Sequence, residues 1–202
     1  MSKFVFIAVL SAVFLFVIFF QIGCTDEGKA KPKSQQEMIE MGKYIVHTSG
    51  CDDCHTPKIF TDKGPVFDTT KQLSGHPQGD VIPPLDVKAL GINQWAATTM
   101  SLTAWVGPWG TTFAINLTPH PDGLGLWTED QFVHAIRTGL HLGVGRPILP
   151  PMPWPAYAHM TDEDLRAIFA YLRTLPPVAN VVPQPLPPRL ATNTQSPEPA
   201  HP

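Results

Sequence analysis

The chain has 202 residues, a formal net charge of −3 and a hydrophobic content of 43%. This size suits one domain with a buried core and long loops. Because no run of basic residues occurs, a nucleic-acid-binding function is excluded, and nucleic acid is not an expected partner. The 23 prolines are unevenly placed, with clusters at residues 147–155 and 176–202.

The N-terminus is typical of an export signal. A basic start at Lys3 leads into an uncharged apolar run from Phe4 to Phe20, and the small residue Gly23 precedes a possible processing point. These three features together make a secretory signal. We therefore predict that residues 1–23 direct export and that the folded part lies on the periplasmic face of a bacterial membrane.

The residues that follow predict a membrane tether. Gly23-Cys24 resembles the end of a bacterial lipobox, which implies that Cys24 is lipidated, although Gln21 stands where that motif usually has an aliphatic residue. An uncleaved membrane span is the alternative, because the apolar run is close to the shortest length that crosses a bilayer. Residues 24–34 are polar and lysine-rich and are expected to form a linker.

A helix is predicted from about Gln35 to Thr48, ended by Ser49-Gly50. Its expected apolar stripe, read from the 3.6-residue period, comprises Met38, Met41, Tyr44 and Ile45.

The next five residues, Cys51-Asp52-Asp53-Cys54-His55, have the Cys-x-x-Cys-His pattern that attaches a c-type haem. Two thiols at i and i+3 lie on one side of a helical turn, so both can form thioether bonds to the haem. The adjacent His55 can bind the iron. A redox-active dithiol or half of a zinc site are the alternatives. The sequence contains neither a thioredoxin-like pattern nor a second pair of zinc ligands. One such motif predicts one covalently bound haem c.

The segment that follows, about residues 56–115, is rich in Gly, Pro and Trp and lacks clear periodicity, so loops with short strands are expected there. A helix should then start at Thr128, where Gln131 completes a capping box, and end at Gly139 or Gly143. A last helix should start at Thr161, with Leu165, Ile168, Phe169 and Leu172 on its buried face. Pro176-Pro177 stops it. Residues 183–202 read as a mobile Pro-rich tail.

This order of elements resembles the class I cytochrome c fold, in which the first and last helices cross. The resemblance implies a mainly α domain over residues 35–182, with a long Gly/Pro/Trp-rich insertion, and a crossing of Gly42 against Tyr171. It is closer in the second half, which resembles bacterial periplasmic cytochromes of the alcohol and sugar dehydrogenase cytochrome-subunit type. The segments that carry it are Asn116-Leu117-Thr118-Pro119, Gly125-Leu126-Trp127-Thr128-Glu129, Arg137-Thr138-Gly139, Pro150-Pro151-Met152-Pro153-Trp154 and Asp162-Glu163-Asp164-Leu165.

The resemblance and the local sequence both indicate Met152 as the second axial ligand of the haem iron, opposite His55. A thioether favours Fe(II) and raises the redox potential. The surrounding prolines restrict the backbone on both sides of Met152, which holds a ligand loop in place. Met160 and Met100 are the other candidates. Met152 can alternatively be a packing residue.

Several further groups can be assigned around the haem. The resemblance implies that the carbonyl of Gly64-Pro65 accepts the second N–H of His55. Arg137 and Arg146 are candidate partners for the haem propionates. His76 is either near a haem edge or an exposed loop residue, and Asp52 and Asp53 are expected to be solvated.

These residues predict a membrane-tethered monohaem cytochrome that carries single electrons and is not an enzyme. The expected donor is a quinol-oxidising complex or a dehydrogenase, and the expected acceptor is a terminal oxidase or another redox protein. Dehydrogenase cytochrome subunits generally carry several haem motifs, so the single motif departs from that pattern. Two alternatives stay open. One is a haem sensor or peroxidase-like protein with a labile sixth ligand. The other is a fixed subunit of a larger respiratory or dehydrogenase complex, with apolar surface supplied by Trp95–Phe113.

Overall fold

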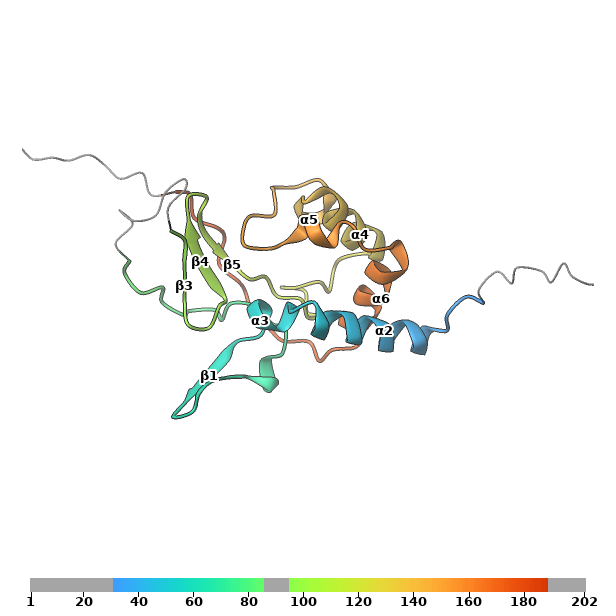
Figure 1. Ribbon diagram of the computed structural model, residues 1–202, viewed down its shortest axis with the longest axis horizontal. Coiled ribbons are helices and arrows are strands. Elements are labelled where there is room, and N and C mark those ends of the chain that lie inside the picture. Colours follow the sequence, from blue (N-terminus) through green and yellow to red (C-terminus); the bar gives the residue numbers. More distant parts are fainter. Residues whose placement is uncertain (1–30, 86–94, 189–202) are drawn as a thin grey trace, which may run out of the picture. The chain divides into compact units, whose positions relative to one another are not determined.

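The computed structural model describes residues 31–85 and 95–188 (Figure 1). The helices and strands of the described residues belong to one compact unit that begins at Gln35. The predicted export signal, residues 1–23, and the predicted lipidation site, Cys24, lie outside the described residues. Within the described ranges, no helix combines the length and the apolar character that a membrane span requires.

Helix α2 spans Gln35–Thr48, as the periodicity predicted, and a short helix α3, Cys51–His55, follows it directly. The two are separated by Gly50, whose φ of 73° lies in the left-handed region that suits glycine. The buried positions of α2 are Gly42 and Val46, whereas Tyr44 is 70% exposed. The predicted stripe was therefore wrong at Tyr44, because the buried face of α2 follows Gly42 and Val46.

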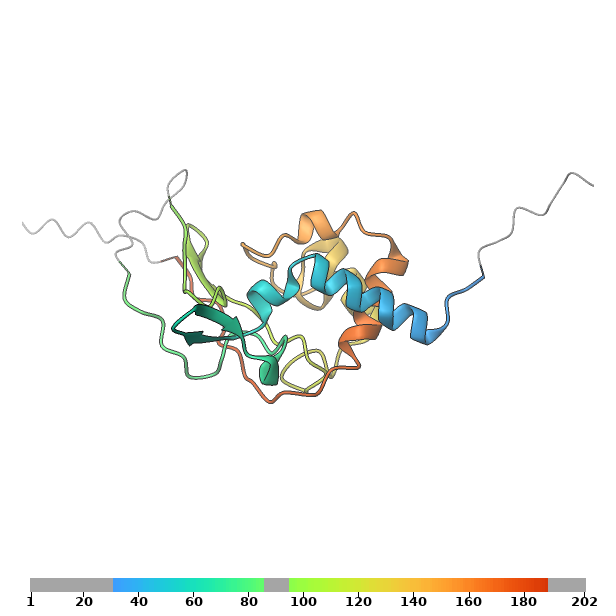
Figure 2. The ribbon, with the colours of Figure 1, turned by 60° about the horizontal axis from the view of Figure 1, so that its bottom comes forward.

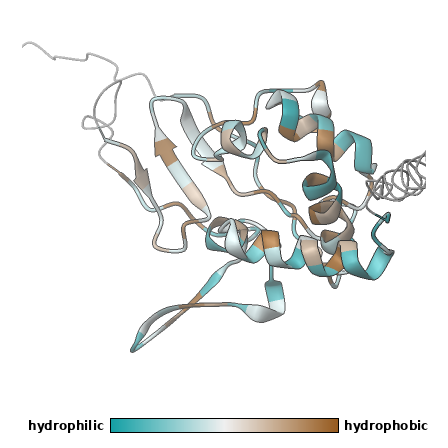
Figure 3. Cartoon of the chain, turned by 45° about the vertical axis from the view of Figure 1, so that its right-hand side comes forward, coloured by the Kyte–Doolittle hydropathy of each residue, from teal (hydrophilic) through white to brown (hydrophobic). Residues whose placement is uncertain are grey.

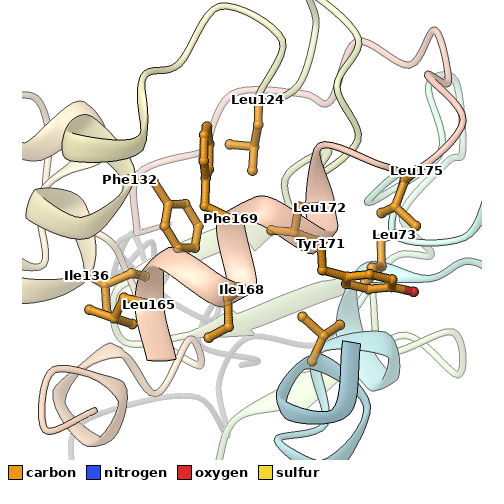
Figure 4. Packing of buried hydrophobic residues seen from close by; sticks show 11 residues of the cluster. Leu73, Leu124, Phe132, Ile136, Leu165, Ile168, Phe169, Tyr171, Leu172 and Leu175 are labelled. Carbon is orange, nitrogen blue, oxygen red and sulfur yellow. The ribbon is translucent and has the colours of Figure 1, made fainter. Parts of the chain in front are cut away.

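The core is built around helix α6, Asp162–Leu172, which packs against both α2 and α4 (Figure 4). Thr161 and Asp164 form a capping box at its start. The four predicted core residues of α6 are all buried. They belong to one cluster with seven further buried residues: Val46, Leu73, Leu124, Phe132, Ile136, Tyr171 and Leu175.

The crossing of α2 and α6 depends on Gly42, as expected, but its partner is Ala167. A Cβ at Gly42 would overlap the backbone carbonyl of Ala167 and lie 3.0 Å from the amide nitrogen of Ile168. Tyr171 packs one turn away, edge-on against His47, with ring centroids 5.9 Å apart. Glycine is needed here because the two backbones touch.

We therefore expect Gly42→Ala to destabilise the protein by at least about 2 kcal/mol, since overpacking a close contact costs more than the helix propensity that alanine adds. Urea unfolding of the exported holoprotein measures this. The control is Lys43→Ala, an exposed position on the same helix, for which a change of less than about 0.5 kcal/mol is expected. Equal midpoints for Gly42→Ala and the wild type would show that the helices can separate without cost.

Helix α4, Glu129–Thr138, begins with the predicted capping box of Thr128 and Gln131 and ends at Gly139, whose φ is 68°. A 3-10 turn, η3 (His141–Gly143), and helix α5 (Trp154–Tyr157) complete this side of the molecule. Figure 3 shows apolar and polar positions alternating along the helices, as in helices with one buried face.

Two small antiparallel sheets stand beside the helices. Strands β1 (Lys58–Thr61) and β2 (Gly64–Phe67) form a hairpin, followed by the 3-10 turn η1 (Thr69–Lys71). Strands β3 (Ala97–Thr98), β4 (Ala104–Gly107) and β5 (Gly110–Phe113) form the second sheet. The short strands expected in residues 56–115 are thus present. The architecture is compatible with a cytochrome c, but the description as mainly α is too simple.

The β1–β2 hairpin projects from the helices (Figures 1 and 2). Its apolar side chains are exposed: Ile59, Phe60, Val66 and Phe67. A lone two-stranded hairpin is marginally stable in water, so this element gains little from the core.

The prediction of a mobile tail from residue 183 was wrong for residues 183–188. Leu186 exchanges two backbone hydrogen bonds with Thr111 of β5, both of 2.9 Å. The chain therefore stays ordered against the second sheet as far as residue 188, and the rest of the predicted tail lies outside the described residues.

Candidate functional site

A cavity of about 440 Å³ lies inside the unit formed by the helices and the second sheet. Its wall comes from α2, α3, β4, β5, α4, α5, α6 and the loop of residues 146–153, and is mostly apolar. All four residues predicted to hold a haem line it: Cys51, Cys54, His55 and Met152. Its size and lining fall in the range of cofactor sites.

Helix α3 places the two cysteines three residues apart on the side that faces the cavity. Both thiols are free. Burial raises the pKa of Cys51 to about 12 and also raises the pKa of Cys54. A redox-active dithiol needs an easily formed thiolate, so this environment opposes that alternative.

The zinc alternative also lacks support in the part of the chain that the structure describes. There, His, Cys, Asp and Glu side chains form no group of three or more that could hold a metal ion. The two sulfurs and one imidazole nitrogen at an apolar cavity instead fit the donor set that attaches and ligates a c-type haem.

His55 is buried and its ring is fixed by one hydrogen bond. Nδ1 lies 2.8 Å from the carbonyl oxygen of Ile115. Since a carbonyl can only accept, Nδ1 carries the proton and Nε2 keeps its lone pair for a metal. Burial lowers the pKa of His55, which favours this neutral form. The predicted partner, Gly64-Pro65, was wrong, because these residues lie in the projecting β1–β2 hairpin.

Met152 is half-buried at the cavity wall, on a loop that the second sheet and α4 hold in place. The hydroxyl of Thr112 donates to the carbonyl of Pro150 at 2.8 Å, and the amide of Ile148 donates to the carbonyl of Gly139 at 2.7 Å. Met160 also lines the cavity, whereas Met100 is exposed. Of the three candidate methionines, only Met100 is thus placed away from the cavity.

Tyr157 of α5 connects two walls of the cavity. Its hydroxyl donates to the carbonyl of Ser49, at the junction of α2 and α3, at 2.7 Å. Burial raises its pKa to about 12, so it remains a neutral donor. The bond ties the chain that follows Met152 to the helix that carries the cysteines.

The cavity has a polar end at Arg146 and His141. Both residues also line an adjoining cavity of about 400 Å³ with the polar residues Asn116, Asp122 and Gln184. The His141 ring lies edge-on to Trp127, at 5.0 Å between centroids. Arg137, the other arginine predicted to face the propionates, instead pairs with Asp162 at 2.6 Å and donates to the carbonyl of Ala158.

Two side chains, His76 and Asp52, are buried. His76 is 1% exposed and hydrogen-bonds Thr103 through Nδ1 at 2.9 Å, so the interpretation as an exposed loop residue was wrong. It is not among the residues that line the cavity. Asp52 was expected to be solvated and is 9% exposed, whereas its neighbour Asp53 is exposed as expected.

Comparisons with known proteins place the chain beside large cytochrome subunits. It is 39% identical over 156 residues to the alcohol dehydrogenase (quinone) cytochrome c subunit of Komagataeibacter europaeus, covering 76% of this chain and 25% of that protein. The subunit of the same description from Gluconobacter oxydans is 28% identical over 148 residues, or 72% of this chain and 23% of that protein.

A third relative is the gluconate 2-dehydrogenase cytochrome c subunit of Pantoea cypripedii, 27% identical over 152 residues, or 74% of this chain and 26% of that protein. The chain therefore spans about a quarter of the length of these curated relatives. No protein-family model matches it.

Proposed function

Since this chain is a c-type cytochrome of the dehydrogenase cytochrome-subunit type, we propose that it carries single electrons as a membrane-tethered protein with one haem. The observation that carries the proposal is the convergence of two cysteine sulfurs, the His55 imidazole and the Met152 thioether on one apolar cavity. The haem, when bound, supplies the Fe(III)/Fe(II) couple.

The chain's own residues hold the cofactor and keep water away from it. Cys51 and Cys54 provide the thioether sulfurs, His55 one axial ligand through Nε2, and Met152 the other. Arg146 and His141 face the polar end of the cavity, where they suit the anionic propionates. Because no bond of a substrate is made or broken in this role, the chain acts as an electron-transfer component and not as an enzyme.

The partners follow from the relatives and from the predicted tether. A dehydrogenase is the favoured electron donor, because the relatives are cytochrome subunits of dehydrogenases. A quinol-oxidising complex is the alternative donor, and a terminal oxidase or another redox protein is the acceptor. Lipidation of Cys24 would raise the effective concentration of the domain near such membrane partners.

A second candidate function is that of a fixed subunit in a larger complex. Exposed apolar side chains favour it: those of the β1–β2 hairpin together with Trp95 and Met100. Clusters of exposed apolar residues are typical of protein interfaces. Mass measurement on gently solubilised membranes distinguishes the two, since a free monomer excludes the fixed subunit.

Optical spectra of the oxidised and reduced exported protein test the proposal, with haem quantified in alkaline pyridine. One haem c per chain and a far-red charge-transfer band that disappears on reduction are expected for a Met–Fe(III) bond. A haem without that band that readily binds carbon monoxide would instead indicate a sensor or a peroxidase-like protein. A protein without haem would overturn the assignment of Cys51, Cys54 and His55.

A further inference from the structure

A buried carboxylate lies inside the haem-attachment helix. Asp52 stands between the two cysteines, and its Oδ1 accepts hydrogen bonds from the Thr56 hydroxyl at 2.8 Å and the Gln72 amide at 3.3 Å. Its Oδ2 lies 2.7 Å from Nδ1 of His47 on α2. A buried charge is costly unless it is paired and hydrogen-bonded, and these three partners supply that compensation.

His47 connects this carboxylate to solvent. Its side chain is 41% exposed, and its Nε2 lies 3.4 Å from the hydroxyl of Tyr171 on α6. Imidazole is the side-chain group that ordinarily changes charge between pH 5 and 8. Two charged or titratable groups face His47 from other helices: Asp52 of α3 and Tyr171 of α6. On α2 itself, Lys43 lies one turn before His47 and Glu40 lies two turns before it.

We propose that Asp52 and His47 form a proton-linked control of the haem redox potential, an inference that rests on the proposed electron-transfer function. A buried negative charge in α3 stabilises Fe(III) over Fe(II) and lowers the potential. When His47 is protonated, its positive charge offsets that of Asp52 and the potential rises. The coupling is direct, because Asp52 lies three residues before the axial ligand His55 in α3 and its charge acts on the His55 imidazole.

The coupled step balances one electron and one proton. When a one-electron donor reduces the bound haem, Nε2 of His47 would take one proton from water. Nδ1–H continues to donate to Asp52. The Tyr171 O–H, which donates to the neutral Nε2, turns so that its oxygen accepts from Nε2–H. Because Fe(III) carries one more positive charge than Fe(II), it repels a protonated His47 more strongly. The potential must therefore fall as the pH rises.

Midpoint potentials of the exported holoprotein between pH 5 and 8 test this inference. We expect Asp52→Asn to raise the midpoint potential at pH 8 by about 59 mV, which for one electron is a tenfold change in the equilibrium constant for electron exchange. We expect His47→Gln to remove the pH dependence and to keep a potential near the high-pH value of the wild type. The matched control is Asp53→Asn. Asp53 lines the cavity, but its carboxylate is exposed, so water screens its charge and a smaller shift is expected.

Equal shifts in Asp52→Asn and Asp53→Asn would overturn the role of the buried charge. A pH dependence that persists in His47→Gln would overturn the proton link. If Asp52→Asn fails to mature, His47→Gln still decides the inference, because its side chain lies partly at the surface. A wild-type protein without covalent haem would refute the proposed function itself, whereas a haem protein with a pH-independent potential would refute only this inference.

Discussion

Exported protein in which Cys51 and Cys54 are both replaced by serine is expected to carry no covalently bound haem. A serine oxygen does not form the thioether that links a cysteine sulfur to a haem vinyl group, and α3 offers no other sulfur to the cavity. The measurement is the pyridine spectrum of the protein after extraction with acidic acetone, which removes haem that is not covalently bound. Retention of haem in the double variant after extraction would contradict the assignment.

The loss of haem should also lower stability. Without the haem, the mostly apolar wall of the cavity of about 440 Å³ loses its packing partner. The variant is therefore expected to unfold or to collapse around the site. Near-UV circular dichroism detects this. The single variant Cys54→Ser is the control, because one thioether still retains the haem and should preserve the fold.

The parts of the fold that the sequence predicted well are those set by local chemistry. The bounds of α2, Gln35–Thr48, follow from a short-range apolar period and from Gly50. The starts of α4 and α6 follow from capping boxes at Thr128 and Thr161, whose members are three residues apart. The placement of Cys51 and Cys54 on one side of α3 likewise depends only on helix geometry.

The parts that were missed depend on contacts between distant segments. His55 is fixed by the carbonyl of Ile115, sixty residues later in the chain, and nothing in a linear pattern identifies one carbonyl in a segment without periodicity. The burial of Asp52 likewise arises from Gln72 and from the packing of α3 against the rest of the unit. Leu186 pairs with Thr111 through backbone groups alone. Because this pairing does not depend on side chains, the residue pattern of a Pro-rich segment does not predict it.

Replacement of Met152 by alanine is expected to remove the far-red charge-transfer band of the oxidised protein and to lower its potential. A thioether ligand stabilises Fe(II) and raises the potential, and axial ligands set haem potentials over a range of about 0.8 V, so we expect a fall of at least about 0.1 V. The reduced variant should bind carbon monoxide readily, because the iron gains an open position. Optical redox titration and carbon monoxide difference spectra measure both effects.

The matched control is Met160→Leu, since Met160 also lines the cavity but directly precedes the cap residue of α6. Leucine keeps its packing volume, so band and potential should stay close to those of the wild type. If Met160→Leu loses the band and Met152→Ala keeps it, the ligand is Met160, and the restricted Pro-rich loop serves packing alone. If both variants keep the band, neither methionine binds the iron. The bonds from Thr112 to Pro150 and from Ile148 to Gly139 favour Met152, because they fix its loop against two elements of the cavity wall.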